Sequence, residues 1–442
     1  MMLKWYNLWF YRFLCGCMAL VMDTYENNIK NDYKMNVLFL TMTSGFDNID
    51  TRGIYTDLVR KFRTEGHEVY IVYPNERRTG KPTEVLSDGN IHSLGVRTLN
   101  VTKTNIVEKG IGQLLLESQF KSALKKYFGK VKFDIILYST PPITFNNVIR
   151  YAKKVSGNNA MTYLLLKDIF PQNAVDMGML SKTGVKGILY KMFRRKEEEL
   201  YRLSDYIGCM SPANVSYVLK HNPKVNAQKI EIAPNSVELA PEDSMDSVKS
   251  SLILEKYGLP IDKPILIYGG NLGVPQGIPF LMKCLEANAD REDCHFVVVG
   301  SGTYYKRLAD WNKARKPKAV TIIKGLPKAD YDQLVRACHV GLIFLDYRFT
   351  IPNFPSRLLS YLEYKMPVIA CTDPNCDTGT IAEDNGFGLY APSNDVNAFS
   401  AAVDNILKAD IKLMGEKGYQ FLKKNYLVEH TYNAIIKHTV DK

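Results

Sequence analysis

From Met35 onward, short apolar runs alternate along the sequence with amphipathic stretches of helix length. This pattern is typical of βα units, which form a parallel sheet covered by helices. The predicted strands cover residues 37–41, 69–73, 135–138, 162–166, 206–210, 265–268, 296–299, 320–323, 340–344 and 368–371. The predicted helices cover 53–65, 112–128, 185–203, 278–287, 304–314, 331–337, 356–364 and 397–408. Both halves of the chain therefore have the sequence pattern of an α/β domain.

The stretch 236–251 is acidic, polar and poor in large apolar side chains, as expected of a linker. It divides the chain into an N-terminal Rossmann-like domain (35–235) and a C-terminal one (252–410), which is followed by a helical segment (411–442). Open α/β sheets bind ligands at the carboxyl ends of their strands, so two such domains facing each other define a ligand cleft.

Composition limits the class of protein and of partner. Hydrophobic residues make up 46% and charged residues 23% of the 442 residues, which excludes a disordered, collagen-like or polytopic membrane protein. The net charge of +11 favours an anionic partner. No nucleic-acid-binding module is apparent, which argues against nucleic acid. The eight cysteines form no Cys-x-x-Cys or Cys/His cluster, so we expect a reduced, cytoplasmic protein without a structural metal.

Residues 1–34 do not fit the βα pattern. The run WYNLWFYRFLCGCMALVM is long enough to cross a membrane, but Arg12 near its middle is costly in hydrocarbon. Three interpretations stay open: an over-extended reading frame with the natural start at Met35, a membrane-associating segment, or a cleaved signal peptide.

A glycine-rich turn, GGNLGVPQGIPFL, directly follows the predicted strand 265–268. Gly269, Gly270 and Gly273 allow the backbone to approach a ligand closely, and the following helix offers unpaired N–H groups to an anion. The turn therefore predicts a phosphate site, although glycines that only permit a tight connection would look the same. Gly300, after the next strand, is a weaker instance of the same pattern.

The stretch TIPNFPSRLLSYLEYKMPVIA contains a second group of candidates. Ser356 is predicted to cap a helix, and Glu363 lies on its last turn. Arg357 falls in the first turn, where the helix dipole gives a cation no stabilisation. An anionic ligand explains Arg357 better, with a solvated surface arginine as the alternative.

The N-terminal half carries fewer candidates. Asp168 follows the apolar run YLLL at a predicted strand end and should face the cleft, unless it is only solvated or caps a helix. Gly45 and Gly53 belong to a long first βα loop of the kind that binds substrates. The Asp330-Tyr-Asp332 triplet could bind a metal, but acids at a helix start are the better interpretation.

The order and spacing of these motifs resemble retaining glycosyltransferases of family 4, which have the GT-B fold of two facing Rossmann-like domains. The similarity runs from Met35 to the C-terminus. It rests on GHEV (66–69), APNSVEL (233–239), YGGNLGVPQGI (268–278), VVVGSG (297–302), KGLP (324–327) and PSRLLSYLEYKMPVIA (355–370). The segment DIFP at Asp168 is similar to the Asp-Leu-Trp-Pro of a bacterial branch acting in surface-polysaccharide assembly, such as capsule or O-antigen.

The resemblance implies a hexosyltransferase-type enzyme that takes a sugar from a nucleotide sugar, UDP-linked in preference, with retained configuration and no metal or cofactor. The acceptor implied is a polyprenyl-diphosphate-linked sugar or a saccharide. Asp168 and Glu363 carry the implied catalytic roles, and Gly45 and Gly53 lie on the acceptor side. The implied donor-binding residues are Gly269, Gly270, Asn271, Gly273, Gln276, Gly300, Ser356, Arg357 and Ser360.

Two departures from the family pattern matter. Pro352 and Ser360 replace the family's pair of glutamates, and Asn271 and Gln276 replace its diphosphate-binding Arg and Lys. We expect Glu363, one turn after Ser360, to take over the ribose or sugar contact. Arg357 and backbone N–H groups would then hold the diphosphate. The lost glutamates also leave a catalytically silent partner subunit open, and a GT-B UDP-sugar 2-epimerase is the second enzyme alternative.

Residues 182–196 contain six basic residues, no acid and interleaved apolar side chains at helical spacing. A basic amphipathic helix predicts contact with an anionic membrane surface, and therefore a peripheral location on the inner face of the cytoplasmic membrane. The alternative is that the apolar stripe covers the sheet of its own domain and only the basic side meets solvent.

Overall fold

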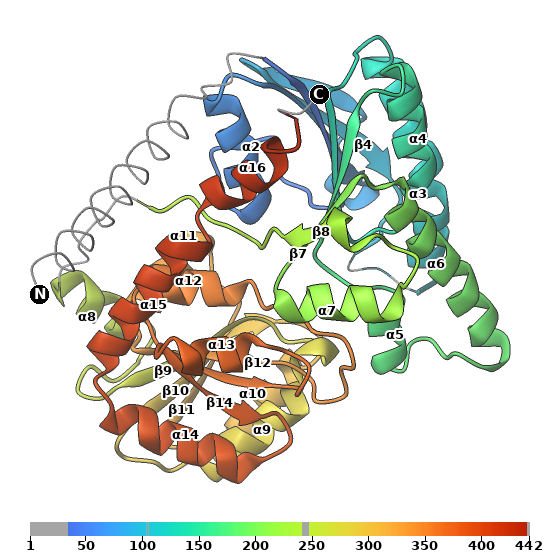
Figure 1. Cartoon of the computed structure of the whole chain (residues 1–442). Helices are drawn as coiled ribbons and strands as arrows, with labels where there is room; N and C mark the ends of the chain where they lie inside the picture. Colours follow the sequence, from blue (N-terminus) through green and yellow to red (C-terminus); the bar gives the residue numbers. More distant parts are fainter. Residues whose placement is uncertain (1–33, 103, 105, 241–246, 440–442) are drawn as a thin grey trace, which may run out of the picture.

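The computed structural model describes residues 34–102, 104, 106–240 and 247–439. Residues 1–33 of the predicted N-terminal extension and part of the predicted linker lie outside these residues. The described chain forms two β-sheets, one in each half, and both are covered by helices (Figure 1). The strands pair in parallel except β3 with β4. The predicted α/β class with two parallel-sheet domains is confirmed.

The N-terminal sheet has the strand order β3-β4-β2-β1-β5-β6-β7-β8. Its strands are β1 (Asn36–Leu40), β2 (Glu68–Glu76), β3 (Glu84–Asp88), β4 (Ile91–Thr98), β5 (Ile135–Ser139), β6 (Met161–Leu166), β7 (Tyr206–Cys209) and β8 (Ile230–Ile232). The helices are α2 (Ile54–Thr64), α3 (Ile106–Phe128), α4 (Asn146–Val155), α5 (Gln172–Asp176), α6 (Gly184–Leu203) and α7 (Pro212–His221), with short 3-10 turns η1 (Arg77–Thr79) and η2 (Ala227–Lys229). Every residue of β5 and β6 is buried, as expected of central parallel strands covered on both faces.

The C-terminal sheet has the order β11-β10-β9-β12-β13-β14. Its strands are β9 (Ile265–Asn271), β10 (His295–Ser301), β11 (Val320–Lys324), β12 (Val340–Phe344), β13 (Val368–Thr372) and β14 (Gly388–Pro392). Its helices are α8 (Ser247–Lys256), η3 (Val274–Gln276), α9 (Ile278–Ala287), α10 (Tyr305–Arg315), α11 (Lys328–Ala337), α12 (Arg357–Glu363), α13 (Thr378–Asp384), α14 (Val396–Lys408) and α15 (Ile411–Asn425). The last helix, α16 (Val428–Ile436), packs against the N-terminal domain.

Some elements differ from the sequence-based expectation. Strands β3 and β4 form an antiparallel hairpin that was not predicted, although the Gly89-Asn90 pair between them is a recognised hairpin-turn signal. Ser356 does not cap α12 with its side chain, because its own backbone is already helical (φ −60°, ψ −18°), whereas a capping residue needs an extended backbone.

The C-terminal segment joins the two domains. Helix α15 packs on α12 in the C-terminal domain, whereas α16 returns to the N-terminal domain and packs on α2 (Figure 1). Where the chain crosses back, Val237 N donates to Tyr426 O (2.9 Å) and Val428 N donates to Val237 O (3.0 Å). The two crossing segments are therefore hydrogen-bonded to each other, and the last helix completes the core of the first domain.

Tyr432 is the residue of α16 on which this docking can be tested. Its side chain is buried, its ring centroid lies 5.0 Å from that of Phe62, and its hydroxyl is 2.8 Å from His67 Nε2. We predict that Tyr432→Ala lowers the free energy of unfolding by about 3 kcal/mol, because a large buried side chain is removed. Tyr432→Phe should cost about 1 kcal/mol, since only the hydrogen bond is lost.

Denaturant unfolding followed by circular dichroism measures both values. Leu413→Ala is the control, because Leu413 lies on the neighbouring helix α15 but is exposed, so its loss should change the unfolding free energy by less than about 0.5 kcal/mol. Equal effects of Tyr432→Ala and Leu413→Ala would contradict the docking of α16.

Candidate active site

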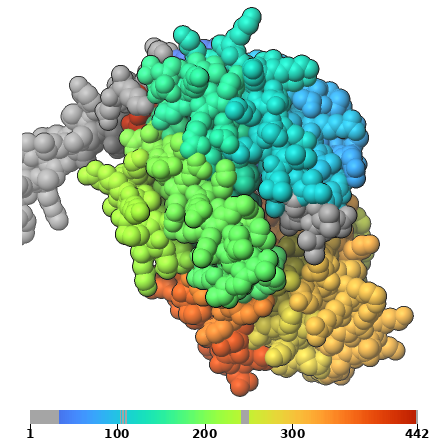
Figure 2. All heavy atoms as spheres, turned by 90° about the vertical axis from the view of Figure 1, so that its right-hand side faces the viewer, coloured from blue at the N-terminus to red at the C-terminus, as the bar shows by residue number. Residues whose placement is uncertain are grey.

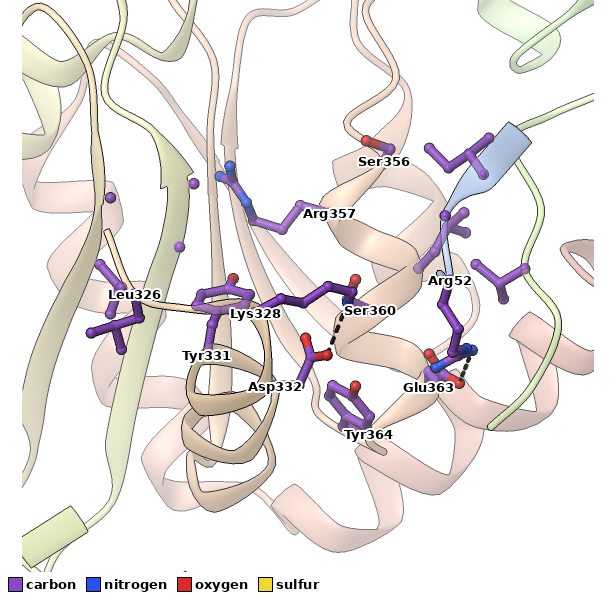
Figure 3. Close-up of a pocket in the computed structure, with 18 of the residues that line it drawn as sticks. Arg52, Leu326, Lys328, Tyr331, Asp332, Ser356, Arg357, Ser360, Glu363 and Tyr364 are labelled. Atoms are coloured by element: carbon purple, nitrogen blue, oxygen red, sulfur yellow. Dashed lines mark hydrogen bonds and ion pairs between the residues drawn. The ribbon is translucent and has the colours of Figure 1, made fainter. Parts of the chain in front are cut away.

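A cavity of about 470 Å³ opens between the two domains at the carboxyl ends of β9 and β10 (Figure 3). The N-terminal domain contributes Arg52, Gly53, Ile54 and Asp57. Val237 comes from the crossing segment, which is the stretch 236–240 that leads from the first domain to the second. The C-terminal domain contributes Gly269, Gly270, Val299, Gly300, Ser301, Gly325, Leu326, Lys328, Tyr331, Asp332, Ser356, Arg357, Leu359, Ser360, Glu363 and Tyr364. The C-terminal domain therefore forms most of the wall.

Glycines at the strand ends make room for the side chains of this wall. Gly270 has φ +125°, and a Cβ there would overlap the guanidinium of Arg357. A Cβ on Gly269 would overlap the hydroxyl of Tyr331, and one on Gly300 would overlap the carbonyl of Gly270. These positions therefore need glycine for close approach, and at Gly270 also for backbone conformation.

Arg357 is the one arginine of the C-terminal wall. Its side chain runs from α12 toward the strand ends (Figure 3), and its guanidinium carbon lies 4.5 Å from the centroid of the Tyr268 ring. Within the described parts of the chain, no acidic residue forms an ion pair with it. A partly buried cation without a counter-ion, next to an open cavity, is suited to bind an anion.

Further polar groups surround Arg357. The hydroxyls of Ser356 and Ser360 face the cavity and form no hydrogen bond with another described residue. Burial raises the pKa of Tyr331 to about 12, so its hydroxyl stays protonated and can donate. Lys328 is engaged with Asp332, with 2.9 Å between Nζ and Oδ2. The cavity thus offers several donors beside one unpaired cation.

Glu363 lies at the opposite end of the cavity from Arg357. Arg357, Ser360 and Glu363 are spaced by three residues on one face of α12, so their backbone positions span about 9 Å. Glu363 Oε1 accepts hydrogen bonds from Arg52 Nη2 (2.7 Å) and from the backbone N of Ala240 (2.9 Å). The predicted acid is therefore in the cavity, but it is paired with an arginine of the other domain.

Sequence reasoning missed Arg52. It lies in the first βα loop, which was expected to bind substrate, but Arg52 and Glu363 are 311 residues apart in the sequence. A local motif cannot reveal such a pair. Of the two glycines predicted in this loop, Gly53 lines the cavity, whereas Gly45 lies in the exposed part of the loop.

Asn271 is the last residue of β9, and Gly273 and Gln276 lie in the turn that follows; all three are outside the residues that line the cavity. Asn271 Nδ2 donates to Gln276 Oε1 at 2.9 Å, so the two amides that replace the family's Arg and Lys bind each other. A Cβ on Gly273 would press against the Asn271 side chain. In this structure the three residues shape the turn.

Asp168 lies at the end of β6, outside the cavity that contains Arg357 and Glu363. Both of its carboxylate oxygens accept from Asn173 Nδ2, at 2.7 and 2.8 Å. Burial raises the pKa of Asp168 to about 6. The adjacent Ile169 packs against Leu345, Phe349 and other apolar residues of the C-terminal domain. Asp168 therefore lies at the junction of the domains.

The apolar stripe of α6 faces away from the domain. The exposed fractions are 82% for Val185, 69% for Ile188, 45% for Leu189 and 39% for Met192, whereas α6 buries Gly187, Glu197, Leu200 and Tyr201 on its other side. The alternative that this stripe covers the sheet is therefore wrong. Figure 2 shows α6 (green) at the surface of the N-terminal domain, next to the C-terminal domain.

No described helix combines the length and the apolar character needed to cross a membrane. The described residues also contain no group of three or more His, Cys, Asp and Glu side chains arranged to hold a metal ion.

Proteins with similar sequences include two that are named as glycosyltransferases. Residues 250–421 match the family model described as Glycosyl transferases group 1. The probable glycosyltransferase WbjE of Pseudomonas aeruginosa is 22% identical over 395 residues, which cover 86% of this chain and 91% of WbjE. The putative colanic acid biosynthesis glycosyl transferase WcaI of Escherichia coli (strain K12) is 22% identical over 280 residues, which cover 62% of this chain and 67% of WcaI.

Solved structures show the same fold. The sucrose-phosphate synthase of Thermosynechococcus elongatus superposes with a TM-score of 0.67 at 14% identity, covering 92% of this chain and 99% of that one. Anabaena HepE in complex with UDP-glucose superposes with a TM-score of 0.64 at 12% identity, covering 92% and 100%. This chain therefore has the GT-B fold, carries a glycosyl transferases group 1 domain at residues 250–421, and is a glycosyltransferase.

Proposed function

We propose that the protein moves a hexosyl residue from a nucleotide sugar, UDP-linked in preference, to a polyprenyl-diphosphate-linked or saccharide acceptor in cell-surface polysaccharide biosynthesis. The transfer retains the anomeric configuration, as in the family that the sequence resembles, and needs no metal. The observation that carries the proposal is the unpaired guanidinium of Arg357 in the interdomain cavity. The UDP-glucose complex of HepE and the colanic acid pathway named for WcaI support the donor and the pathway.

Arg357 is proposed to bind the diphosphate of the donor. In the transfer, the bond between the anomeric carbon and the diphosphate oxygen breaks, the acceptor hydroxyl bonds to that carbon, and its proton passes to a base. Negative charge grows on the leaving diphosphate, and a cation already fixed in place stabilises it without reorganisation. Because Arg357 supplies this positive charge, the proposal assigns no role to a metal ion. Glu363, about 9 Å further along α12, is assigned to the ribose.

Asp168 is proposed as the acceptor-side base. Its pKa of about 6 lets it lose its proton at neutral pH and still exchange protons readily. Its position outside the donor cavity requires the acceptor to approach from the domain junction.

The exposed stripe of α6 is proposed to bind an anionic membrane, where a lipid-linked acceptor would reside. Lys186, Lys191 and Arg195 flank the exposed Val185 and Ile188. Apolar side chains can enter the lipid interface while the basic side chains contact anionic headgroups. The N-terminal half of α3 adds further exposed apolar side chains, namely Ile111, Leu114 and Leu115.

Substitution of Arg357 tests donor binding directly. We predict that Arg357→Ala weakens binding of UDP by about tenfold to a hundredfold, because a charge-assisted contact worth about 1.5–3 kcal/mol is lost. The UDP affinity of Arg357→Lys should lie between those of the wild type and Arg357→Ala, since the charge stays but the bidentate geometry of the guanidinium is lost. Isothermal titration calorimetry with UDP and with GDP, each with and without EDTA, measures these affinities.

Arg315→Ala is the matched control for Arg357→Ala. Arg315 lies on α10 in the same domain, and it forms ion pairs with Glu286 and Asp290, outside the lining of the cavity. Unchanged nucleotide affinity in Arg357→Ala, or a loss of affinity on adding EDTA, would contradict the corresponding part of the proposal.

The role of Asp168 has a distinct pH signature. A base must be deprotonated to accept a proton, so the transfer rate should rise through about pH 6 and level off above it. Asp168→Asn should lower kcat by about a hundredfold or more, remove this rise and leave UDP affinity unchanged. Initial rates with a labelled donor between pH 5 and 8 measure this, and an unaltered rise in Asp168→Asn would contradict the assignment.

Membrane binding is tested by removing the exposed apolar side chains of α6. We predict that Val185→Ser with Ile188→Ser reduces co-sedimentation with anionic phosphatidylglycerol vesicles at least tenfold, because two side chains no longer enter the interface. Since both residues are exposed, folding should not suffer. Leu413→Ser, which removes one exposed apolar side chain on α15, should bind like the wild type. Wild-type protein that stays in solution at low salt would contradict the prediction.

A further inference from the structure

We propose that Arg52, from the N-terminal domain, is a positioning residue of the donor site: it holds Glu363 so that the second carboxylate oxygen faces the nucleotide sugar. The inference rests on the proposed function, because it needs a nucleotide in the cavity. It adds a residue of the opposite domain to a site formed mainly by the C-terminal domain.

The two oxygens of Glu363 have different surroundings. Oε1 accepts from Arg52 Nη2 at 2.7 Å and from the backbone N of Ala240 at 2.9 Å. Within the described part of the chain, no group donates to Oε2. The Glu363 side chain is only 9% exposed and lines the cavity. Two donors on one oxygen fix the plane of the carboxylate and leave the other oxygen for a ligand.

Arg52 is itself held on a rigid base. The backbone N of Gly53 donates to Asp57 Oδ1 at 2.9 Å, and the backbone N of Glu238 donates to Asp57 Oδ2 at 3.0 Å. Arg60 Nη2 also donates to Asp57 Oδ1, at 2.6 Å, and Arg52 donates to the carbonyl of Glu238. Asp57 is buried, so this network fixes the start of α2 against the crossing segment. Arg52 therefore approaches Glu363 from a fixed direction.

The charge of the pair indicates which ligand group it accepts. Arg52 already compensates the negative charge of Glu363, so the free oxygen suits a neutral hydrogen-bond donor better than a second cation. A phosphate would be repelled by the carboxylate. The hydroxyls of a ribose are neutral donors, and the roughly 9 Å between Glu363 and Arg357 leaves room for a diphosphate at the other end.

A double-mutant cycle on nucleotide affinity tests the inference. The variants are Arg52→Ala, Glu363→Gln and the double variant, and the ligands are UDP and its 2′-deoxy analogue. We expect each single variant to bind UDP about tenfold more weakly, and the double variant to bind no more weakly than Glu363→Gln. Both single variants should also lose the wild type's preference for UDP over the deoxy analogue. In turnover, KM for the donor should rise while kcat changes little, because the ribose contact is equal in ground and transition states.

Arg63→Ala is the matched control. Arg63 lies on the same helix as Arg60, its side chain is 29% exposed against 32% for Arg52, and it forms ion pairs with Asp50 and Asp88 away from the cavity. It should leave UDP affinity unchanged. A merely structural Arg52 would weaken UDP and the deoxy analogue alike, and that result overturns the inference.

Three further outcomes separate the inference from the proposed function. If Arg357→Ala weakens UDP binding while Arg52→Ala does not, the positioning role is wrong and the donor site stands. Additive losses in the double variant would mean that Arg52 contacts the nucleotide itself, which also overturns the positioning role. Absence of UDP and GDP binding by the wild type overturns both.

Discussion

The close approach of Arg357 to the end of β9 is the contact on which the interdomain cavity depends. The guanidinium occupies the volume that a side chain at Gly270 would fill, and it rests on the Tyr268 ring of the same strand. Any larger residue at Gly270 would displace the cation and distort a backbone that already has a positive φ. The absence of an acidic partner among the described residues then leaves the cation available, because a counter-ion would cancel the field that a diphosphate needs. The end of β9, Gly270 and Arg357 therefore form one structural unit, because the position of each depends on the others.

Under the proposed function, this unit would hold a diphosphate in a chain that lacks the Arg and Lys of the family it resembles. The two positions are Asn271 and Gln276, whose amides bind each other at 2.9 Å and close the turn after β9. The positive charge enters the cavity from α12 instead. A cation on a helix that packs against the sheet is held by the core on one side, since Leu358, Leu359 and Leu362 of α12 are fully buried. Because the cation lies on a packed helix and not in a turn, its position is fixed before a ligand binds, as a preorganised anion site requires.

The sequence predicted the fold better than the site, and the reason lies in the range of the interactions. Apolar runs such as those of β6 and β12 depend on local composition, and every predicted strand overlaps an observed one. The hairpin β3–β4 was missed because its outer strand is largely exposed and lacks an apolar run. Arg357 and Glu363 were recognised from one local motif. Arg52 was not, because its partner lies 311 residues away and no local pattern encodes a contact between domains. The same is true of α16, whose apolar residues match the core of a domain that ended about 200 residues earlier.

The contacts that join the two domains differ in what they contribute. Helix α16 buries Val428, Ile435 and neighbouring side chains in the N-terminal core, and burial of this kind dominates stability. The Arg52–Glu363 pair is different, because its side chains are 32% and 9% exposed and such partly exposed pairs contribute only about 0–1 kcal/mol. Its small contribution to stability and its position in the wall of the cavity fit the proposed role of the pair in orienting the carboxylate. The pair thus orients a carboxylate at little gain in stability, whereas the apolar contacts of α16 hold the last helix in the N-terminal core.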